Sequence, residues 1–359
     1  MKIIPLLTII VLTLFESCNK EDTVQTLDQK IEQIVKSHIV FGRTPGVAVG
    51  TYHNGIGKNY FFGTKNLSTG EPIDEFTIFE IGSVTKTFTA LLFASYVIES
   101  NLNLTDTIDG YFPQNITVPS KDGVHIKFVN LLNHTSGLPY MPDNLPSDLS
   151  VADYSEVDLA AFFNGYELNS APGTEYCYSN LGMGLAGYLV SNIFSTSYNQ
   201  LLNEKIFSLM EMNYTSCDSA SLLTSNFAQG YYGNQPVGFR QWSDIFAPAG
   251  AILSNLHDMM IYLKQNMEFE NSSLSDALSL TKTSTFEINE HQHIGLGWNI
   301  IINDDNSNIY WHNGGTKGFS SFIAYNSSTQ NGVVVLINSY CFGEQNIIGI
   351  EVLNLLDNN

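Results

Sequence analysis

The sequence predicts an α+β fold, in which an antiparallel sheet is assembled from both ends of the chain and a mainly α-helical domain is inserted between them. Two observations predict this arrangement. Runs rich in β-branched and aromatic residues occur at residues 46–65 and again at 294–338, whereas helical patterns dominate the region between them. A sheet buries its apolar side chains against helices on its faces. We therefore expect a sheet of about five to six strands, flanked by the two terminal helices.

The amino-terminal part is predicted to be a helix followed by a hairpin. Apolar residues recur at helical spacing from Leu27 to Val35, so residues 24–41 are expected to form an amphipathic helix. Gly46–His53 and Lys58–Lys65 have the composition of strands, and Asn54-Gly55 lies between them. Because Asn-Gly favours a tight turn, these two strands are expected to form a β-hairpin.

Helical patterns and strand patterns divide the rest of the chain. The predicted helices of the middle region are Phe128–Asn133, Ser155–Gly165, Asn180–Phe194, Tyr198–Leu209 and Ser254–Met267, the last with Ser254 as N-cap. The predicted carboxyl-terminal elements are the strands Ile294–Ile302, Ser307–His312, Phe319–Tyr325 and Gly332–Asn338 and the helix Glu344–Leu356. One catalytic domain is expected at residues 27–357, with an α/β part at about 27–80 and 285–357 and a helical part at about 81–284.

Composition narrows the classes of function. Apolar residues make up 43% of the 359 residues, which is typical of a globular chain. Acidic residues outnumber basic ones 35 to 15, and the formal net charge is −20. Because nucleic-acid binding needs clustered Lys and Arg, no nucleic-acid partner is expected. His291 and His293 lack a third clustered ligand, so neither a metal nor another cofactor is expected.

Residues 1–18 are predicted to be a lipoprotein-type signal peptide. Lys2 precedes an apolar run from Ile3 to Phe15, which is too short to cross a bilayer core. Cys18 stands where a lipoprotein would be cleaved and lipidated, and residues 19–26 form a charged tether. This resemblance implies a lipid anchor in the outer membrane of a bacterial envelope. The alternative is a plain cleaved signal.

Three further cysteines are present, Cys177, Cys217 and Cys341. An odd number cannot all pair within one chain. Pairing of Cys177 with Cys217 stays open, and no essential disulfide is expected.

The stretch Phe79–Ser100 is predicted to be a buried helix with a polar start, because about four helical turns of it are almost wholly apolar. Ser83 and Lys86 lie at this start. Residues three apart share a helix face, which brings the ammonium group of Lys86 within reach of the Ser83 hydroxyl. A serine beside a base is the arrangement of an activated nucleophile. The alternative is that Ser83 only caps the helix and that Lys86 is solvated.

Three motifs occur in order along the chain: Ser83-Val-Thr-Lys86, Tyr178-Ser-Asn180 and His312-Asn-Gly-Gly315. Further shared stretches are Leu-Leu-Asn-His-Thr-Ser-Gly-Leu from Leu131, Pro172-Gly173, Ala249-Gly-Ala-Ile-Leu-Ser254 and Gly295-Leu-Gly-Trp298. In these motifs the chain resembles the serine β-lactamase and penicillin-binding protein superfamily over residues 31–356. The resemblance is to the branch with class C β-lactamases, D-alanyl-D-alanine carboxypeptidases and related esterases.

The resemblance implies a role for each motif residue. Ser83 would attack an acyl carbonyl and form an acyl-enzyme, with Lys86 and Tyr178 as a mutually tuned pair that moves protons. The proton is not assigned to one member of this pair, because coupled groups titrate as a unit. The backbone N–H groups of Ser83 and Gly315 would form the oxyanion hole.

Four residues are expected to bind substrate: Asn180, His312, Gly314 and Lys317. Asn180 would also hydrogen-bond Lys86, or else cap the following helix. Most β-lactamases have Lys-Thr-Gly where this chain has His312-Asn-Gly, so charge at this position is expected only when His312 is protonated. Lys317, on the same strand face, would partly restore that charge. His134 is expected to be structural.

The sequence therefore predicts an envelope serine hydrolase that is monomeric and acts on a small-molecule or peptide substrate. The expected substrate is a D-amino-acid peptide or a small ester or amide. One alternative is a β-lactamase of class C type. Another alternative, from a different class, is a peptide-binding or penicillin-sensing protein without turnover, although a pure binder has no need of Ser83, Lys86 and Tyr178 together.

Overall fold

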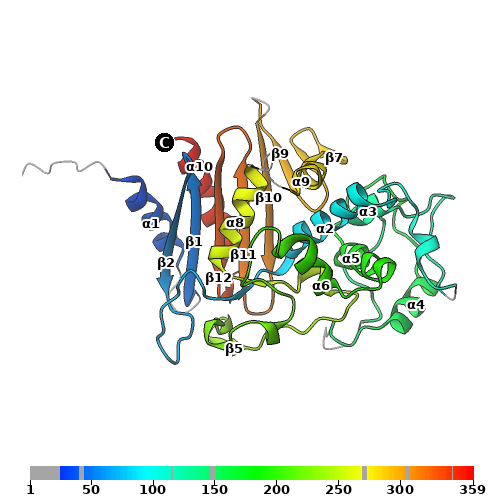
Figure 1. The fold of residues 1–359 in the computed structure, drawn as a ribbon, viewed down its shortest axis with the longest axis horizontal. Coiled ribbons are helices and arrows are strands. Elements are labelled where there is room, and N and C mark those ends of the chain that lie inside the picture. Colours follow the sequence, from blue (N-terminus) through cyan, green and yellow to red (C-terminus); the bar gives the residue numbers. More distant parts are fainter. Residues whose placement is uncertain are drawn as a thin grey trace, which may run out of the picture.

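The computed structural model describes residues 25–39, 44–114, 116–145, 151–268, 273–304, 307–341 and 343–359. Its central element is an antiparallel sheet in the order β2-β1-β12-β11-β10-β9-β8-β7. Strands from the two ends of the chain meet where β1 pairs with β12 (Figure 1). The predicted α+β fold class is confirmed. The sheet has eight strands in the described part of the chain, rather than five to six.

The strands and helices have the following bounds. The strands of the large sheet are β1 (Gly46–His53), β2 (Ile56–Gly63), β7 (Phe286–Asn289), β8 (Gln292–Ile294), β9 (Asn299–Ile302), β10 (Asn308–Gly315), β11 (Ser320–Asn326) and β12 (Asn331–Ile337). Smaller sheets contain β3 (Phe79–Glu80), β4 (Gly230–Tyr232), β5 (Gln235–Val237), β6 (Leu253–Ser254) and β13 (Ser339–Tyr340). The α-helices are α1 (Leu27–His38), α2 (Thr85–Glu99), α3 (Phe128–Leu132), α4 (Glu156–Gly165), α5 (Asn180–Phe194), α6 (Tyr198–Leu202), α7 (Ala247–Gly250), α8 (Leu256–Met267), α9 (Ser275–Lys282) and α10 (Glu344–Asp357).

Side chains of the central strands alternate between two cores. On β12, Val333, Val335 and Ile337 belong to the core beneath α1 and α10, whereas Val334 and Leu336 belong to the larger core on the opposite face. This alternation follows from the two-residue period of a strand. Because β12 is buried on both faces, its sequence is a continuous apolar run rather than an alternating one.

Helix α8 covers the sheet face opposite to α1 and α10, and it contacts β1, β11 and β12 (Figure 1). Residues 81–284 were expected to form the helical part, so one helix of that part, α8, packs on the sheet. The prediction of Ser254 as its N-cap is wrong by one residue. Asn255 is the cap and accepts a hydrogen bond from the Asp258 N–H, because Ser254 still pairs as the end of β6.

The predicted single strand Ile294–Ile302 is wrong. The chain turns at Gly295–Trp298, where Gly297 has φ +69° and the Gly295 N–H donates to the Trp298 carbonyl at 2.9 Å. Positive φ is readily adopted only by glycine. The stretch is therefore a hairpin of β8 and β9, and β8 pairs in turn with β7. The predicted hairpin at Asn54-Gly55 is confirmed, with φ of +51° and +77°.

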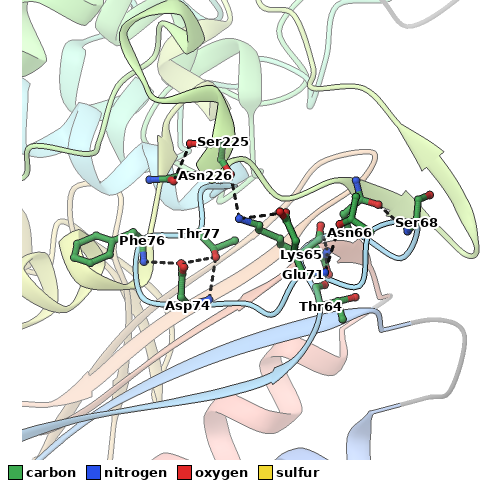
Figure 2. A network of polar contacts seen from close by, with 12 residues as sticks. Thr64, Lys65, Asn66, Ser68, Glu71, Asp74, Phe76, Thr77, Ser225 and Asn226 are labelled. Carbon is green, nitrogen blue, oxygen red and sulfur yellow. Dashed lines mark hydrogen bonds and ion pairs between the residues drawn. The ribbon is translucent and has the colours of Figure 1, made fainter.

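The connection from β2 to β3 is anchored by polar contacts, shown in Figure 2. Lys65 Nζ donates to the Ser225 carbonyl at 3.0 Å and lies 3.4 Å from the Glu71 carboxylate. Asp74 Oδ1 accepts from the Thr77 hydroxyl at 2.7 Å and from the Phe76 N–H at 3.1 Å. These contacts fix the path of the chain immediately before β3, which leads into the predicted nucleophile.

The predicted signal peptide, the lipidation site Cys18 and most of the tether lie outside the described residues and stay predictions. Across the described ranges, no helix is long and apolar enough to cross a bilayer.

Candidate active site

Ser83 lies in a short turn that is held between the small sheet of β3 and β6 and the large sheet. The Ser321 hydroxyl of β11 donates to the Ile81 carbonyl at 2.7 Å, two residues before Ser83. The 3₁₀ turn Gly82–Val84 follows and leads directly into α2. Residues 85–96 of α2 are all buried, so the predicted buried helix is confirmed. The Ser83 side chain itself is partly exposed and therefore accessible to a substrate.

Lys86 is buried directly behind the Ser83 hydroxyl. Its Nζ lies 2.9 Å from Ser83 Oγ and donates to the Ala249 carbonyl at 2.7 Å. Lys86 has 0% exposure, and burial lowers the pKa of its amine well below the ordinary value. Burial thus favours the neutral amine, whose lone pair can accept the Ser83 proton.

Tyr178 lies beside both residues, at the entrance to α5. Lys86 Nζ is 5.0 Å from the centroid of its ring, and the rings of His134 and Tyr140 lie at 4.5 and 6.1 Å. Burial raises the pKa of Tyr178, although its contact with the Ser83 hydroxyl lowers it. Burial therefore favours the protonated phenol and the neutral form of the neighbouring amine in this coupled pair.

The residues around Tyr178 fix the start of α5. The N-cap is Ser179, whose Oγ accepts from the Gly182 N–H at 2.8 Å, so the alternative role of Asn180 as the cap is wrong. His134 Nδ1 accepts from the Ser179 N–H at 3.2 Å, in agreement with a structural His134. Among the described residues, Asn180 makes no hydrogen bond to Lys86, and its backbone N–H donates to the Tyr140 carbonyl at 3.0 Å.

His312 lies on β10, with its ring centroid 6.3 Å from that of Tyr178. Its side chain is buried, and its Nδ1 lies 2.6 Å from the Asn313 carbonyl, to which it donates. Burial, together with the charge of Lys86, lowers the pKa of His312 to about 3. His312 was expected to supply positive charge only when protonated, and the lowered pKa leaves the ring neutral near pH 7.

The backbone at Gly82 and the backbone at Gly315 are in direct contact. A Cβ atom at Gly82 would lie 2.7 Å from Gly315 N, and one at Gly314 would lie 2.1 Å from the Ile81 carbonyl oxygen and 3.0 Å from Ser83 N. The end of β10 therefore runs against the turn that carries the nucleophile. This places the N–H groups predicted as the oxyanion hole, those of Ser83 and Gly315, on two facing segments.

A cavity of about 960 Å³ opens beside Gly315. Its lining includes four aromatic and two cationic side chains, those of Tyr140, Tyr232, Phe239, Tyr340, Arg240 and Lys317. Lys317 was expected on the face of the strand, but β10 ends at Gly315, so Lys317 lies in the following turn with an exposed side chain. Its charge stands at the rim of the cavity rather than beside Tyr178.

Three residues, Ala249, Tyr140 and Arg240, were not named as site residues from the sequence. The Ala249 carbonyl holds Lys86, but a backbone oxygen gives no sequence signal beyond the shared stretch in which it lies. Tyr140 and Arg240 enter through the loops that precede α4 and α7. Arg240 is one of two arginines in the chain, which is the one feature of the sequence that singles it out.

Metal-binding clusters of three His, Cys, Asp or Glu residues are absent from the described part of the chain. His293 contacts the Ser284 hydroxyl and His291 lies beside Glu290, both in the region of β7 and β8. Cys177, Cys217 and Cys341 are free thiols.

Comparisons with known proteins agree with this geometry. The sequence profile of a family described as Beta-lactamase matches residues 27–345. A relative named Beta-lactamase from Escherichia coli (strain K12) is 24% identical over 92% of this chain and 94% of its own length. Protein flp from Staphylococcus aureus (strain MW2) is 26% identical over 86% of this chain and 63% of its own. A solved class C beta-lactamase superposes with a TM-score of 0.80 at 22% identity, over 93% of this chain and 96% of that one.

Proposed function

Because this chain belongs to the beta-lactamase family and is a serine hydrolase, we propose that Ser83 attacks an ester or amide carbonyl and forms an acyl-enzyme. The observation that carries this proposal is the 2.9 Å contact between Ser83 Oγ and the buried Lys86 amine. Burial is the cause of the lowered pKa of Lys86, so the amine can take the proton of Ser83 as its oxygen attacks. The developing oxyanion would accept hydrogen bonds from the Ser83 and Gly315 N–H groups.

Tyr178 completes the proton path in this proposal. Its phenol is protonated at neutral pH and touches Ser83, so it can donate to the leaving group. As the leaving group departs with the Tyr178 proton, the proton that Lys86 gained would pass to the Tyr178 phenolate, which restores both groups. In deacylation, the same groups would activate a water molecule in the reverse direction.

The proposed substrate is a D-amino-acid peptide or a small ester or amide, acting as acyl donor. Two features support a donor that does not depend on a fixed positive charge beside Tyr178. His312 is neutral near pH 7, and the exposed Lys317 stands at the rim of the cavity. Asn180 and Gly314 would contact the amide of the donor. Gly314 lies against the Ser83 turn, and Asn180 begins α5 two residues after Tyr178.

A β-lactam is the second candidate substrate. The observation that favours it is the relatives named Beta-lactamase, one of which matches 92% of this chain. In this case the acyl-enzyme would form by opening of the lactam ring, with the same roles for Ser83 and Lys86.

The test is incubation with a p-nitrophenyl ester, a D-alanyl-D-alanine peptide and a fluorescent penicillin, followed by intact-mass measurement. We expect one acyl adduct on the wild type and none on Ser83→Ala. Ser68→Ala is the matched control, because Ser68 is an exposed loop serine that does not line the cavity beside Gly315. Equal turnover by Ser83→Ala would refute the acyl-enzyme. A lasting adduct with no turnover of any donor would instead support the penicillin-sensing alternative.

We further propose that the protein is anchored in the outer membrane of the bacterial envelope by lipid on Cys18, at the end of the predicted signal peptide. Supporting this is the position of Cys18 after the apolar run that ends at Phe15. Expression with a labelled fatty acid should label the wild type and leave Cys18→Ser unlabelled. Labelling of Cys18→Ser would contradict the proposal.

A further inference from the structure

Glu80 is a buried carboxylate that the catalytic steps above do not use. It lies on β3, three residues before Ser83, and is 4% exposed. Oε1 accepts a hydrogen bond from the backbone N–H of Arg240, and Oε2 accepts one from the Thr316 hydroxyl. The Glu80 side chain therefore connects β3, which precedes Ser83, with two separate segments of the cavity wall, one at Arg240 and one at Thr316.

Both partners of Glu80 adjoin the proposed reaction centre. Thr316 directly follows Gly315, so its bond to Glu80 holds the end of β10 against the Ser83 turn. Arg240 lines the same cavity as Gly315 and Lys317. The guanidinium carbon of Arg240 lies 4.8 Å from the ring centroid of Trp242. A movement of the Arg240 loop should therefore change the fluorescence of Trp242.

We propose that Glu80 is a positioning residue whose ionised carboxylate locks the Arg240 loop and the Thr316–Lys317 turn onto β3, and that its protonation loosens both and weakens catalysis. This inference rests on the proposed function for its effect on turnover, but the locking itself does not depend on which acyl donor is used. Glu80 acts through Gly315 and the cavity wall and touches no reacting atom.

The chemistry of a carboxyl group explains why protonation matters here. An ionised carboxylate accepts from both partners at once, in charge-assisted bonds that are about twice as strong as neutral ones. A protonated carboxyl group carries one O–H, which is a donor. The two partners of Glu80 are donors as well, so this O–H would point at a group that also donates a hydrogen. Either the Thr316 hydroxyl reverses its direction or the bond to the Arg240 N–H weakens.

Glu80 is expected to gain and lose its proton in a range of pH that can be reached experimentally. Burial raises the pKa of Glu80 to about 7, while the bonds from Thr316 and Arg240 and the charge of Arg240 lower it. Arg240 is the charged group that faces Glu80 in the described structure, and it stays protonated throughout this range. Lys317 follows Thr316, but its side chain is exposed to solvent and screened.

The first test does not require turnover. The fluorescence of Trp242, taken as the difference between the wild type and Trp242→Phe, is titrated from pH 5 to 9. We expect a transition with its midpoint near pH 7 in the wild type and none in Glu80→Gln, which is isosteric with the protonated acid. No transition in the wild type, or the same midpoint in Glu80→Gln, would overturn the proposal.

The second test uses kcat/KM for the p-nitrophenyl ester over the same range. For the wild type it should rise roughly tenfold through pH 7, because a loosened oxyanion donor loses part of its effect. Glu80→Gln should stay at the low value at every pH, with a folded circular dichroism spectrum. Thr316→Ser should behave as the wild type, and Thr316→Val should move the midpoint to higher pH, because it removes a bond that favours the ionised form. A wild-type pH profile in Glu80→Gln would refute the role of Glu80, whereas absence of ester turnover in the wild type would count against the proposed function alone.

Discussion

Substitution of Gly82 by alanine should separate the two segments that form the proposed oxyanion hole. Gly82 has φ +49°, and its Cβ would lie 2.7 Å from Gly315 N and 3.0 Å from the Gly315 carbonyl carbon and oxygen. Real Cβ atoms do not approach backbone atoms so closely, so one segment has to move. Since Ser83 follows Gly82 directly, that movement changes the distance between the Ser83 and Gly315 N–H groups.

The expected magnitudes follow from these two features. A left-handed backbone at a non-glycine residue destabilises by about 1–2 kcal/mol, and overpacking of a buried contact adds about 1–3 kcal/mol. The free energy of unfolding of Gly82→Ala should therefore fall by about 2–5 kcal/mol. Displacement of one oxyanion donor should lower kcat for ester hydrolysis by about 100- to 1,000-fold.

Two variants control for the separate effects. Gly70 has φ +70° but no atom within 4 Å of its Cβ position, so Gly70→Ala should lose only about 1–2 kcal/mol of stability and keep full activity. Gly315→Ala should retain activity and stability, because its Cβ would meet Tyr340 at an ordinary 3.4 Å. Urea denaturation and initial rates measure all three variants. Turnover by folded Gly82→Ala at the wild-type rate would refute the argument that this close contact sets the oxyanion hole.

Three further outcomes are expected. His312→Gln should leave the shape of the pH–rate profile between pH 5 and 8 unchanged, because burial lowers the pKa of His312 to about 3; loss of an acidic limb would show that the ring titrates in that range. The Ser179 hydroxyl caps α5 and also donates to the Pro139 carbonyl at 2.6 Å. Ser179→Ala should therefore lower the free energy of unfolding by about 1–2 kcal/mol in urea titrations, and an unchanged unfolding midpoint would contradict this. Burial lowers the pKa of Lys282 to about 7, so between pH 7 and about 10 the unfolded chain binds the extra proton, and the contribution of Lys282 to stability should rise with pH by on the order of 4 kcal/mol at most. Lys86 is a second buried lysine with a lowered pKa, so Lys282→Met should reduce the rise seen in denaturation curves, and an equal rise in Lys282→Met and the wild type would refute the assignment.

Local patterns were sufficient to predict most elements of the fold. The hairpin at Asn54-Gly55 and the helix from Asn180 to Phe194 need only turn chemistry and apolar spacing to be predicted. The errors lie where a glycine or a capping residue determines the end of an element. Gly297 breaks a run that otherwise has the composition of one strand, and the caps of α5 and α8 each differ by one residue from the expected ones.

Tertiary contacts account for what the sequence could not predict about the site. Ser83 and Lys86 are three residues apart, so the helix period alone brings them together. Glu80 meets a backbone N–H at Arg240, 160 residues later, and no side-chain pattern marks that partner. The sequence left the charge of His312 open for the same reason: residue type gives the ordinary pKa, whereas burial, which the sequence does not show, lowers it to about 3.

Burial rather than residue type therefore determines the charge of the site at neutral pH. Lys86 and His312 are both bases, yet burial favours the neutral form of each, and it favours the protonated phenol of Tyr178. Transfer of the Ser83 proton to Lys86 would then start from uncharged groups, and the negative charge that develops on the acyl oxygen is the one that the proposed oxyanion hole would stabilise. The exposed positive charge near Gly315 is Lys317, at the rim of the aromatic cavity. Recognition of an anionic acyl donor would then occur at this rim, so the loops that carry Tyr140 and Arg240, rather than the motif residues, would determine which donor is accepted.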